Sequence, residues 1–180
     1  MVEGEGMTRR IVGMMLGAAV LFAAVGCGGT TEGTPTTSTA QPALWNPCNE
    51  IPDDVLRASG VDPATEESGI AGVHQSGWEI CAWRGKTYAI TVYATRRTVA
   101  EFEKKEGNIE FQDVTVAGRQ GRQFKVQGNS KDRHCDILFP VSAGGVVQLS
   151  ISNRASLDDL ENPCTVAYRI GERIVPVFPR

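Results

Sequence analysis

The stretch WEICAWRGKTYAITVYAT, residues 78–95, contains two β-rich segments on either side of Gly85-Lys86. Aromatic and β-branched residues recur at every second position, which places them on one face of an extended strand. A two-residue connection containing glycine commonly joins antiparallel strands. The stretch therefore predicts a β-hairpin. The residues that share a face in its second strand are Tyr88, Ile90, Val92 and Ala94.

Four more segments of strand-like composition follow the hairpin, and glycine-containing turns separate them. They span residues 110–116, 122–127, 135–141 and 146–152. We expect residues 64–77, which contain the glycine-rich sequence GIAGVHQSG, to form a loop.

Helix signals flank and interrupt these strands. A helix is predicted at 52–59, where Pro52 and two acids begin it and Gly60 ends it. Thr98 and Glu101 form a capping-box pattern for a helix at 98–106, and Asn162 is a candidate N-cap for a helix at 163–173. Strands outnumber helices and the connections are short. We therefore predict an α+β fold: an antiparallel sheet of about six strands with two or three helices on one face, and two disulfides.

The N-terminal region has the layout of a secretory signal. Arg9-Arg10 precede the apolar segment 11–25, which is shorter than the roughly 20 apolar residues of a spanning helix. The segment ends at Ala24-Val25-Gly26-Cys27, which resembles the bacterial lipobox, although Ala24 occupies a position that usually carries leucine. We predict a lipoprotein signal peptide over residues 1–26 and lipidation of Cys27. The alternative is an ordinary signal peptide cut near Ala24, with Cys27 a free thiol.

Residues 28–44, GGTTEGTPTTSTAQPAL, lack apolar periodicity and cannot bury enough apolar surface to fold. The sequence therefore predicts a lipidated cysteine and flexible tether over residues 27–45, followed by a single α+β domain over residues 46–180.

Four cysteines remain when Cys27 is set aside, and an even set in an exported chain predicts a disulfide framework. Three pairings are possible. Because consecutive elements tend to be neighbours in space, we favour Cys48–Cys81 with Cys135–Cys164. The other two pairings are Cys48–Cys135 with Cys81–Cys164, and Cys48–Cys164 with Cys81–Cys135.

Composition and motifs indicate no catalytic, metal or cofactor site. The net charge is −3 and no block of basic residues appears, which disfavours nucleic acid as a partner. The cysteines do not have metal-ligand or redox spacing, and nucleophile-elbow, P-loop and dinucleotide motifs are absent from the sequence. Surface or turn positions are expected for the isolated candidates His74, His134, Ser76, Ser142, Asp53, Asp54, Asp158 and Asp159. A solvated strand face is expected for the basic residues Arg119, Arg122, Lys125, Lys131 and Arg133. The alternative for this basic stretch is a surface that faces a phosphate-bearing partner.

Several motifs together resemble a known family. They are PCNEIPDDVLRASGVDP (47–63), CAW (81–83), VAEFEKK (99–105), VTVAGRQG (114–121), HCDILFPVSAGGVVQLSI (134–151) and NPCTVAYRIGERI (162–174). The chain resembles exported lipoproteins of unknown function in mycobacteria and related actinobacteria, of which the Lpr-type lipoproteins LprB and LprC are examples. The resemblance covers about residues 46–174. It implies a surface location and supplies no catalytic residues.

These patterns favour a non-catalytic, lipid-anchored binding or accessory module on the outer face of the cytoplasmic membrane. Its expected partners are the membrane, through the N-terminal lipid, and an envelope protein or lipid ligand. The alternative is a carrier that holds a lipid or other apolar ligand between sheet and helices, with the glycine-rich loop able to open. A secreted hydrolase is a third, weaker hypothesis.

Overall fold

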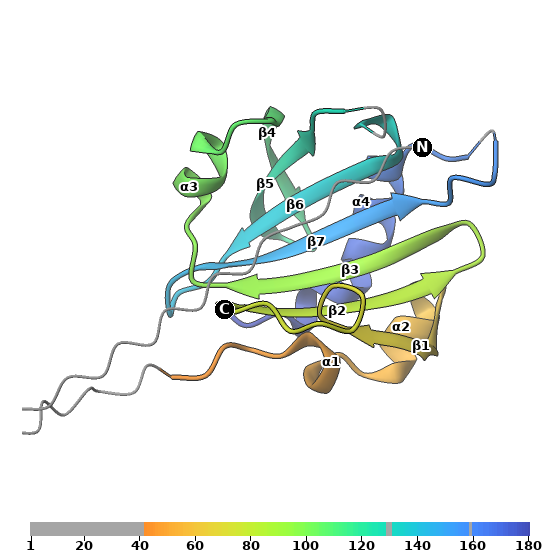
Figure 1. Cartoon of the computed structure of the whole chain (residues 1–180), viewed down its shortest axis with the longest axis horizontal. Coiled ribbons are helices and arrows are strands. Elements are labelled where there is room, and N and C mark those ends of the chain that lie inside the picture. The colour runs from red at the N-terminus through yellow and green to blue at the C-terminus, as the bar shows by residue number, and fades with distance from the viewer. Residues whose placement is uncertain (1–41, 129–130, 159) are drawn as a thin grey trace, which may run out of the picture. The chain divides into compact units, whose positions relative to one another are not determined.

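The computed structural model describes residues 42–128, 131–158 and 160–180. The predicted signal peptide and Cys27 lie outside these residues, as does most of the predicted tether. Figure 1 shows one antiparallel sheet in the order β1-β2-β3-β7-β6-β5-β4. Its strands are β1 (Val61–Ser68), β2 (Trp78–Gly85), β3 (Tyr88–Thr95), β4 (Asn108–Val116), β5 (Arg119–Val126), β6 (His134–Pro140) and β7 (Val146–Asn153).

Four α-helices accompany the sheet: α1 (Pro47–Glu50), α2 (Asp53–Ala58), α3 (Val99–Lys104) and α4 (Pro163–Ile174). Short 3-10 turns, η1 (Lys131–Arg133) and η2 (Val175–Val177), precede β6 and follow α4. The α+β class is confirmed, but the sheet has seven strands rather than about six, and α1 is an additional helix.

The additional strand is β1, most of which falls in the segment predicted to be a loop. Its sequence, VDPATEES, has no run of apolar residues, and its pairing with β2 is interrupted between Asp62 and Glu67. A proline, charged side chains and an irregular register are typical of a strand at the edge of a sheet. The predicted loop is therefore confined to the connection between β1 and β2.

The predicted hairpin is present as β2 and β3, in which Cys81 pairs with Val92 and Trp83 pairs with Ile90. On its other side β3 pairs with β7, and β7 pairs with β6. Strands distant in sequence thus meet at the centre of the sheet, which brings residues of β3 and β7 side by side.

The two faces of the sheet are covered differently. Helix α4 lies behind the sheet in Figure 1, and this back face packs against Val166, Ala167, Ile170 and Ile174. We call the opposite side the front face. A smaller apolar cluster, formed by Phe102, Phe124, Leu138 and Val146, lies there, with Trp78, Val99 and Phe111 packed against it. Helix α3 and the β1–β2 connection are the described elements that border this face.

Candidate functional site

A pocket of about 400 Å³ opens on the front face between α3 and the β1–β2 connection. Its floor comes from four strands, β2, β3, β5 and β7. The floor residues are Trp78, Ile80, Tyr93, Phe124, Val126 and Gln148, and the walls are Ile70, Gln75, Ser76, Phe102, Lys105 and Asn108. Small-molecule sites commonly have volumes of about 300–1,000 Å³ and mostly apolar linings with a few polar groups. This pocket, hereafter the front pocket, is the candidate functional site.

Aromatic rings form a continuous row along the front pocket. The Trp78 ring makes edge contacts with Tyr93 and Phe102, with centroids 6.1 Å apart in both pairs. Phe102 is followed by Phe124 at 5.9 Å, and Phe124 stacks on Phe111 at 5.4 Å. Such a row offers a large apolar contact area, and its rigid aromatic side chains lose little conformational entropy when a ligand binds.

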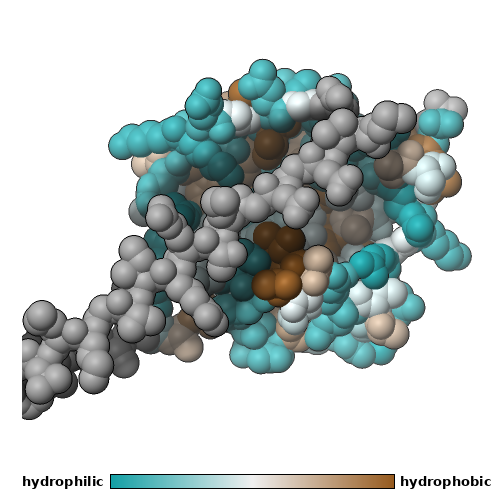
Figure 2. Space-filling view, in the orientation of Figure 1, coloured by the Kyte–Doolittle hydropathy of each residue, from teal (hydrophilic) through white to brown (hydrophobic). Residues whose placement is uncertain are grey.

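The glycine-rich connection forms one wall of the pocket as a tight turn. Ile70 and Val73 exchange backbone hydrogen bonds around Ala71 and Gly72, both of which have positive φ. Only glycine fits at Gly69, because its φ is +72° and a Cβ there would lie 2.3 Å from the Val73 carbonyl oxygen. The turn exposes 57% of Ile70 and 61% of Val73. Figure 2 shows a hydrophobic patch over this connection. Ile70 in this patch also lines the front pocket.

A polar network lies beside the aromatic row. Gln148 Nε2 donates a hydrogen bond to Asp136 Oδ1 at 2.8 Å. Burial raises the pKa of Asp136, while hydrogen bonds from Ser150 and Gln148 oppose that rise. Burial and the nearby Asp136 carboxyl raise the pKa of Tyr93. Tyr93 lines the floor of the pocket, and a phenol hydroxyl can donate a hydrogen bond to a polar group of a ligand there.

Sequence reasoning missed the front pocket because its strand residues alternate with those of the predicted core. A signal was present, however. In the segments that become β6 and β7, apolar residues stand next to one another, as in Ile137-Leu138-Phe139 and Val146-Val147. The structure buries these residues, and Asp136 beside them, in succession. Strands covered on both faces lack the simple alternation of a sheet with one exposed face.

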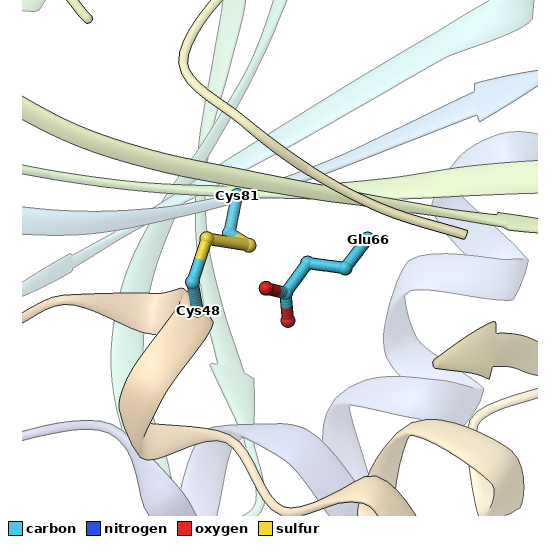
Figure 3. Close-up of side chains that lie close together, drawn as sticks. All are labelled: Cys48, Glu66 and Cys81. Carbon is cyan, nitrogen blue, oxygen red and sulfur yellow. A yellow bond between two sulfur atoms is a disulfide. The ribbon is translucent and has the colours of Figure 1, made fainter. Parts of the chain in front are cut away.

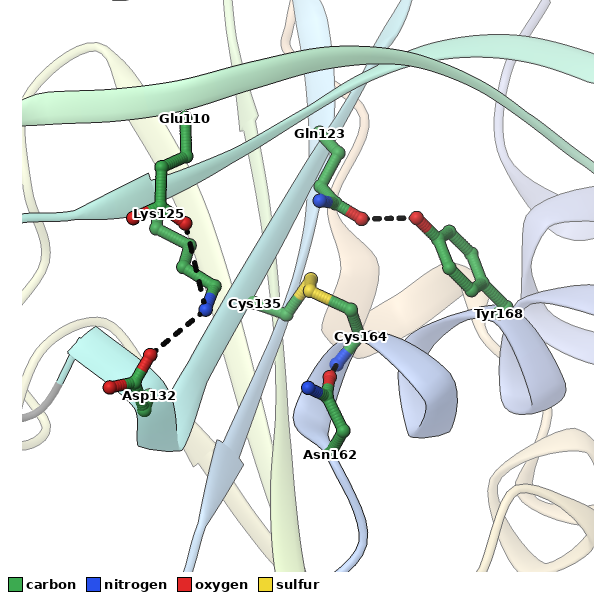
Figure 4. Close-up of a disulfide and its surroundings, with 8 residues drawn as sticks. All are labelled: Glu110, Gln123, Lys125, Asp132, Cys135, Asn162, Cys164 and Tyr168. Carbon is green, nitrogen blue, oxygen red and sulfur yellow. Dashed lines mark hydrogen bonds and ion pairs between the residues drawn. A yellow bond between two sulfur atoms is a disulfide. The ribbon is translucent and has the colours of Figure 1, made fainter.

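The structure contains the two disulfides that the order of elements favoured. Cys48, on α1, is bonded to Cys81 on β2, and Cys135, on β6, is bonded to Cys164 on α4. Figure 4 shows the second bond at the start of α4, where the Asn162 side chain accepts a hydrogen bond from the Cys164 backbone N–H at 2.9 Å. Each bond fastens a helix to the back face of the sheet, away from the front pocket.

One group of potential metal ligands is found among the described residues, and it does not suit a metal. Cys48, Cys81 and the Glu66 carboxylate offer ligand atoms within 4.8 Å of one another. Figure 3 shows the Glu66 carboxylate beside the bond between the two sulfur atoms. The two sulfur atoms are bonded to each other, and a metal requires thiolates. The group is therefore a disulfide with a neighbouring carboxylate.

The isolated polar candidates do not converge on a common site. His74 is exposed on the β1–β2 connection, and His134 is half-buried at the start of β6. Ser76 lines the front pocket, whereas Ser142 donates its hydroxyl to the carbonyl of Arg180. Exposed positions on α2 and in the segment before α4 are occupied by Asp53, Asp54 and Asp158, while Asp159 lies outside the described residues.

The basic residues predicted to share a strand face are largely neutralised within the fold. Lys125 lies between Asp132, at 3.1 Å, and Glu110, at 3.7 Å, as Figure 4 shows. Arg122 contacts Glu103 and Asp113 at 2.8 and 3.0 Å. Arg119 donates to the backbone carbonyls of Pro140 and Phe178, and Lys131 pairs with Glu110 and Asp132. Arg133 belongs to a different cluster, described below.

A family model described as "Protein of unknown function (DUF3558)" matches residues 22–177. No curated protein and no solved structure matches the chain. Among the residues that the structure describes, no helix has the length and apolarity required to cross a membrane.

Proposed function

The chain belongs to the DUF3558 family, and on that premise we propose that it is a non-catalytic, lipid-anchored binding module of the cell envelope. Its ligand is an amphipathic small molecule, such as a lipid, whose apolar part occupies the front pocket. The proposal combines the expected envelope module with the alternative of an apolar-ligand carrier.

The observation that carries the proposal is the aromatic row in a pocket of about 400 Å³ that is bordered by exposed apolar side chains. Exposed apolar side chains at the mouth of a concave site are typical of ligand-binding surfaces. Tyr93 and Gln148 add hydrogen-bonding groups to the floor, and Lys105 adds an ammonium group to the wall. This combination of apolar, hydrogen-bonding and cationic groups suits a ligand with an apolar body and a polar or anionic head.

The disulfides support placing the domain outside the cytoplasm, because such bonds persist in oxidising compartments. The lipobox-like sequence that ends at Cys27 supports lipid anchoring, and the family match over residues 22–177 includes it. Two or more acyl chains would hold the protein stably on a bilayer.

Titration of the domain, residues 42–180, with 1-anilinonaphthalene-8-sulfonate tests the pocket, since this dye has an aromatic body and an anionic head. Ile70→Asp places a charge at the edge of the pocket and should weaken binding about tenfold, the equivalent of about 1.4 kcal/mol of lost apolar contact. Leu157→Asp is the matched control, because Leu157 is also exposed but does not line the front pocket. It should bind as the wild type does.

Dodecanoate should displace the dye from the wild type. If the wild type fails to enhance dye fluorescence, or if both variants lose binding equally, the front pocket does not bind such ligands. Native mass spectrometry of the full chain, purified from its own membrane, is a separate measurement that identifies any co-purifying ligand by its mass.

A further inference from the structure

The β2–β3 turn lies at the right of Figure 1, at one end of the sheet. Basic side chains gather at this end. Two adjoining grooves, of about 850 and 500 Å³, share Arg84, Gly85, Tyr88 and Arg154. We call this region the basic end. The cationic residues that line the two grooves are Arg57, Arg84, Lys86, Arg133, Arg154 and Arg169.

Among the described residues, three of these cations have carboxylate partners and three do not. Arg57 pairs with Asp53 at 2.8 Å, Arg169 pairs with Glu161 at 2.8 Å, and Arg84 pairs with Glu67. Within the described part of the chain, no carboxylate lies within 4.0 Å of the side chains of Lys86, Arg133 and Arg154. One carboxylate, Asp62, also lines the larger groove, but the six cations outnumber it. The basic end is therefore locally cationic, although the whole chain has a net charge of −3.

Hydrogen bonds to backbone carbonyls hold the Arg133 and Arg154 side chains at the rim of the grooves. Arg154 donates to the Gly85 carbonyl at 3.4 Å, and Arg133 donates to the Arg154 carbonyl at 3.2 Å. The Arg154 backbone N–H in turn donates to the Thr87 carbonyl at 3.0 Å. Each guanidinium has five N–H donors, so most of them remain available. Neighbouring cations repel one another, and a bound anion relieves this repulsion.

The basic end lies opposite the point where the described chain begins. Arg96, directly after β3, donates a hydrogen bond to the Pro42 carbonyl, so the described chain begins at that end of β3. A second contact near this start joins the rings of Trp45 and Phe178, whose centroids are 5.6 Å apart. The β2–β3 turn lies at the other end of β3, which at roughly 3.3 Å per residue is about 25 Å away. The predicted tether would therefore join the domain at the end of β3 opposite the basic end.

We propose that the basic end is a second ligand site, which binds a soluble molecule that carries several phosphate groups. Guanidinium groups match phosphate oxygens in a bidentate geometry, and an adjacent ammonium adds a point charge. Two joined grooves with three available cations suit a multivalent anion better than a single phosphate. The choice of a soluble ligand over bilayer head groups rests on the proposed anchoring, because the tether would join the domain at the opposite end of β3 from the basic end.

Isothermal titration of the domain, residues 42–180, with sodium tripolyphosphate tests the proposal. The double variant Lys86→Gln/Arg154→Gln should bind at least about tenfold more weakly, since it removes two charge-assisted contacts. The matched control is Lys104→Gln/Arg173→Gln, which removes the same charge from exposed residues of α3 and α4. It should bind within about twofold of the wild type, and added salt should weaken binding by the wild type.

Absence of binding at low salt, or equal losses in the two double variants, would overturn the proposal. Cosedimentation with vesicles of phosphatidylcholine and phosphatidylglycerol separates the two sources of phosphate. If the wild type cosediments through Lys86 and Arg154 but does not bind tripolyphosphate, the basic end is a membrane-contact surface instead. Binding of the dye to the front pocket should be unchanged in the Lys86→Gln/Arg154→Gln variant, so failure of this proposal is distinguishable from failure of the proposed function.

Discussion

Asp136 and Gln148 are joined by a hydrogen bond of 2.8 Å between Oδ1 and Nε2, on adjacent strands beside the front pocket. Asp136 is 4% exposed, and burial raises its pKa despite the hydrogen bonds from Ser150 and Gln148. The surroundings therefore favour the neutral acid over the carboxylate.

Replacing Asp136 with asparagine should stabilise the protein increasingly as the pH rises. The folded state binds the Asp136 proton more tightly than the unfolded state does. Its contribution to the free energy of unfolding is thus greatest at low pH. As the pH rises, that contribution is lost between about pH 4, which is the ordinary pKa of an aspartate in the unfolded chain, and the raised pKa of Asp136 in the folded state. The introduced asparagine would keep an oxygen acceptor for Gln148 without the charge.

Urea unfolding of the wild type and of Asp136→Asn across this pH range measures the effect. The informative quantity is the difference between the two free energies of unfolding, because pH effects of other groups, such as the lowered pKa of Asp132, cancel in it. A difference that stays constant with pH would show that Asp136 has the same pKa in both states.

Local signals in the sequence predicted much of the fold. The capping box is present, with Glu101 N donating to Thr98 Oγ1 at 3.3 Å and Thr98 N donating to Glu101 Oε2 at 2.7 Å. Asn162 caps α4 as predicted. These features depend on residues a few positions apart, so a single sequence is enough to identify them.

Features that depend on distant pairing were not predicted. β1 is a strand because it pairs with β2 at the edge of the sheet, not because its own residues favour extended structure. The front pocket needs β3 and β7 side by side, and the pairing of Tyr93 with Gln148 joins residues that are far apart in the chain. The basic end likewise combines residues that are far apart in the sequence, from α2, α4 and the ends of β2, β6 and β7. The basic stretch identified in the sequence therefore shares only Arg133 with it.

Cys27→Ala should release the protein from the membrane fraction, or leave it uncleaved, without unfolding the domain. The proposed anchor lies outside residues 42–180, which contain the whole sheet and both disulfides. Detergent-phase partitioning of wild type and variant measures anchoring, and thermal unfolding checks the domain. If the wild type partitions into the aqueous phase as completely as the variant, Cys27 is not lipidated.

Glu66→Gln should accelerate reduction of the Cys48–Cys81 disulfide by dithiothreitol about fivefold. Reduction produces a thiolate, and a carboxylate within 4.8 Å of the sulfur atoms opposes that charge. Two like charges at this distance in water repel by about 1 kcal/mol. Mass spectrometry of peptides alkylated at timed intervals measures the rate. The Cys135–Cys164 bond in the same molecules is the internal control, and equal acceleration of both bonds would contradict the electrostatic explanation.

Gly171→Ala should destabilise the protein although alanine favours helices. Gly171 is buried in α4 where the helix crosses β4, and a Cβ there would lie 2.4 Å from Val116 Cγ1. The gain in helix propensity is about 1 kcal/mol, whereas overpacking a core costs about 1–3 kcal/mol. The helix cannot easily move away, because the Ala117 backbone N–H donates to the Glu172 carboxylate at 3.0 Å, next to the contact.

A double-mutant cycle with Val116→Ala isolates this close contact. Val116→Ala removes the methyl group that the new side chain would meet, so the loss in the double variant should be smaller than the sum of the two single losses. Urea unfolding of the four proteins gives the coupling free energy. If the losses add, α4 adjusts to the extra methyl group by shifting on the sheet, and close packing at Val116 does not explain the glycine.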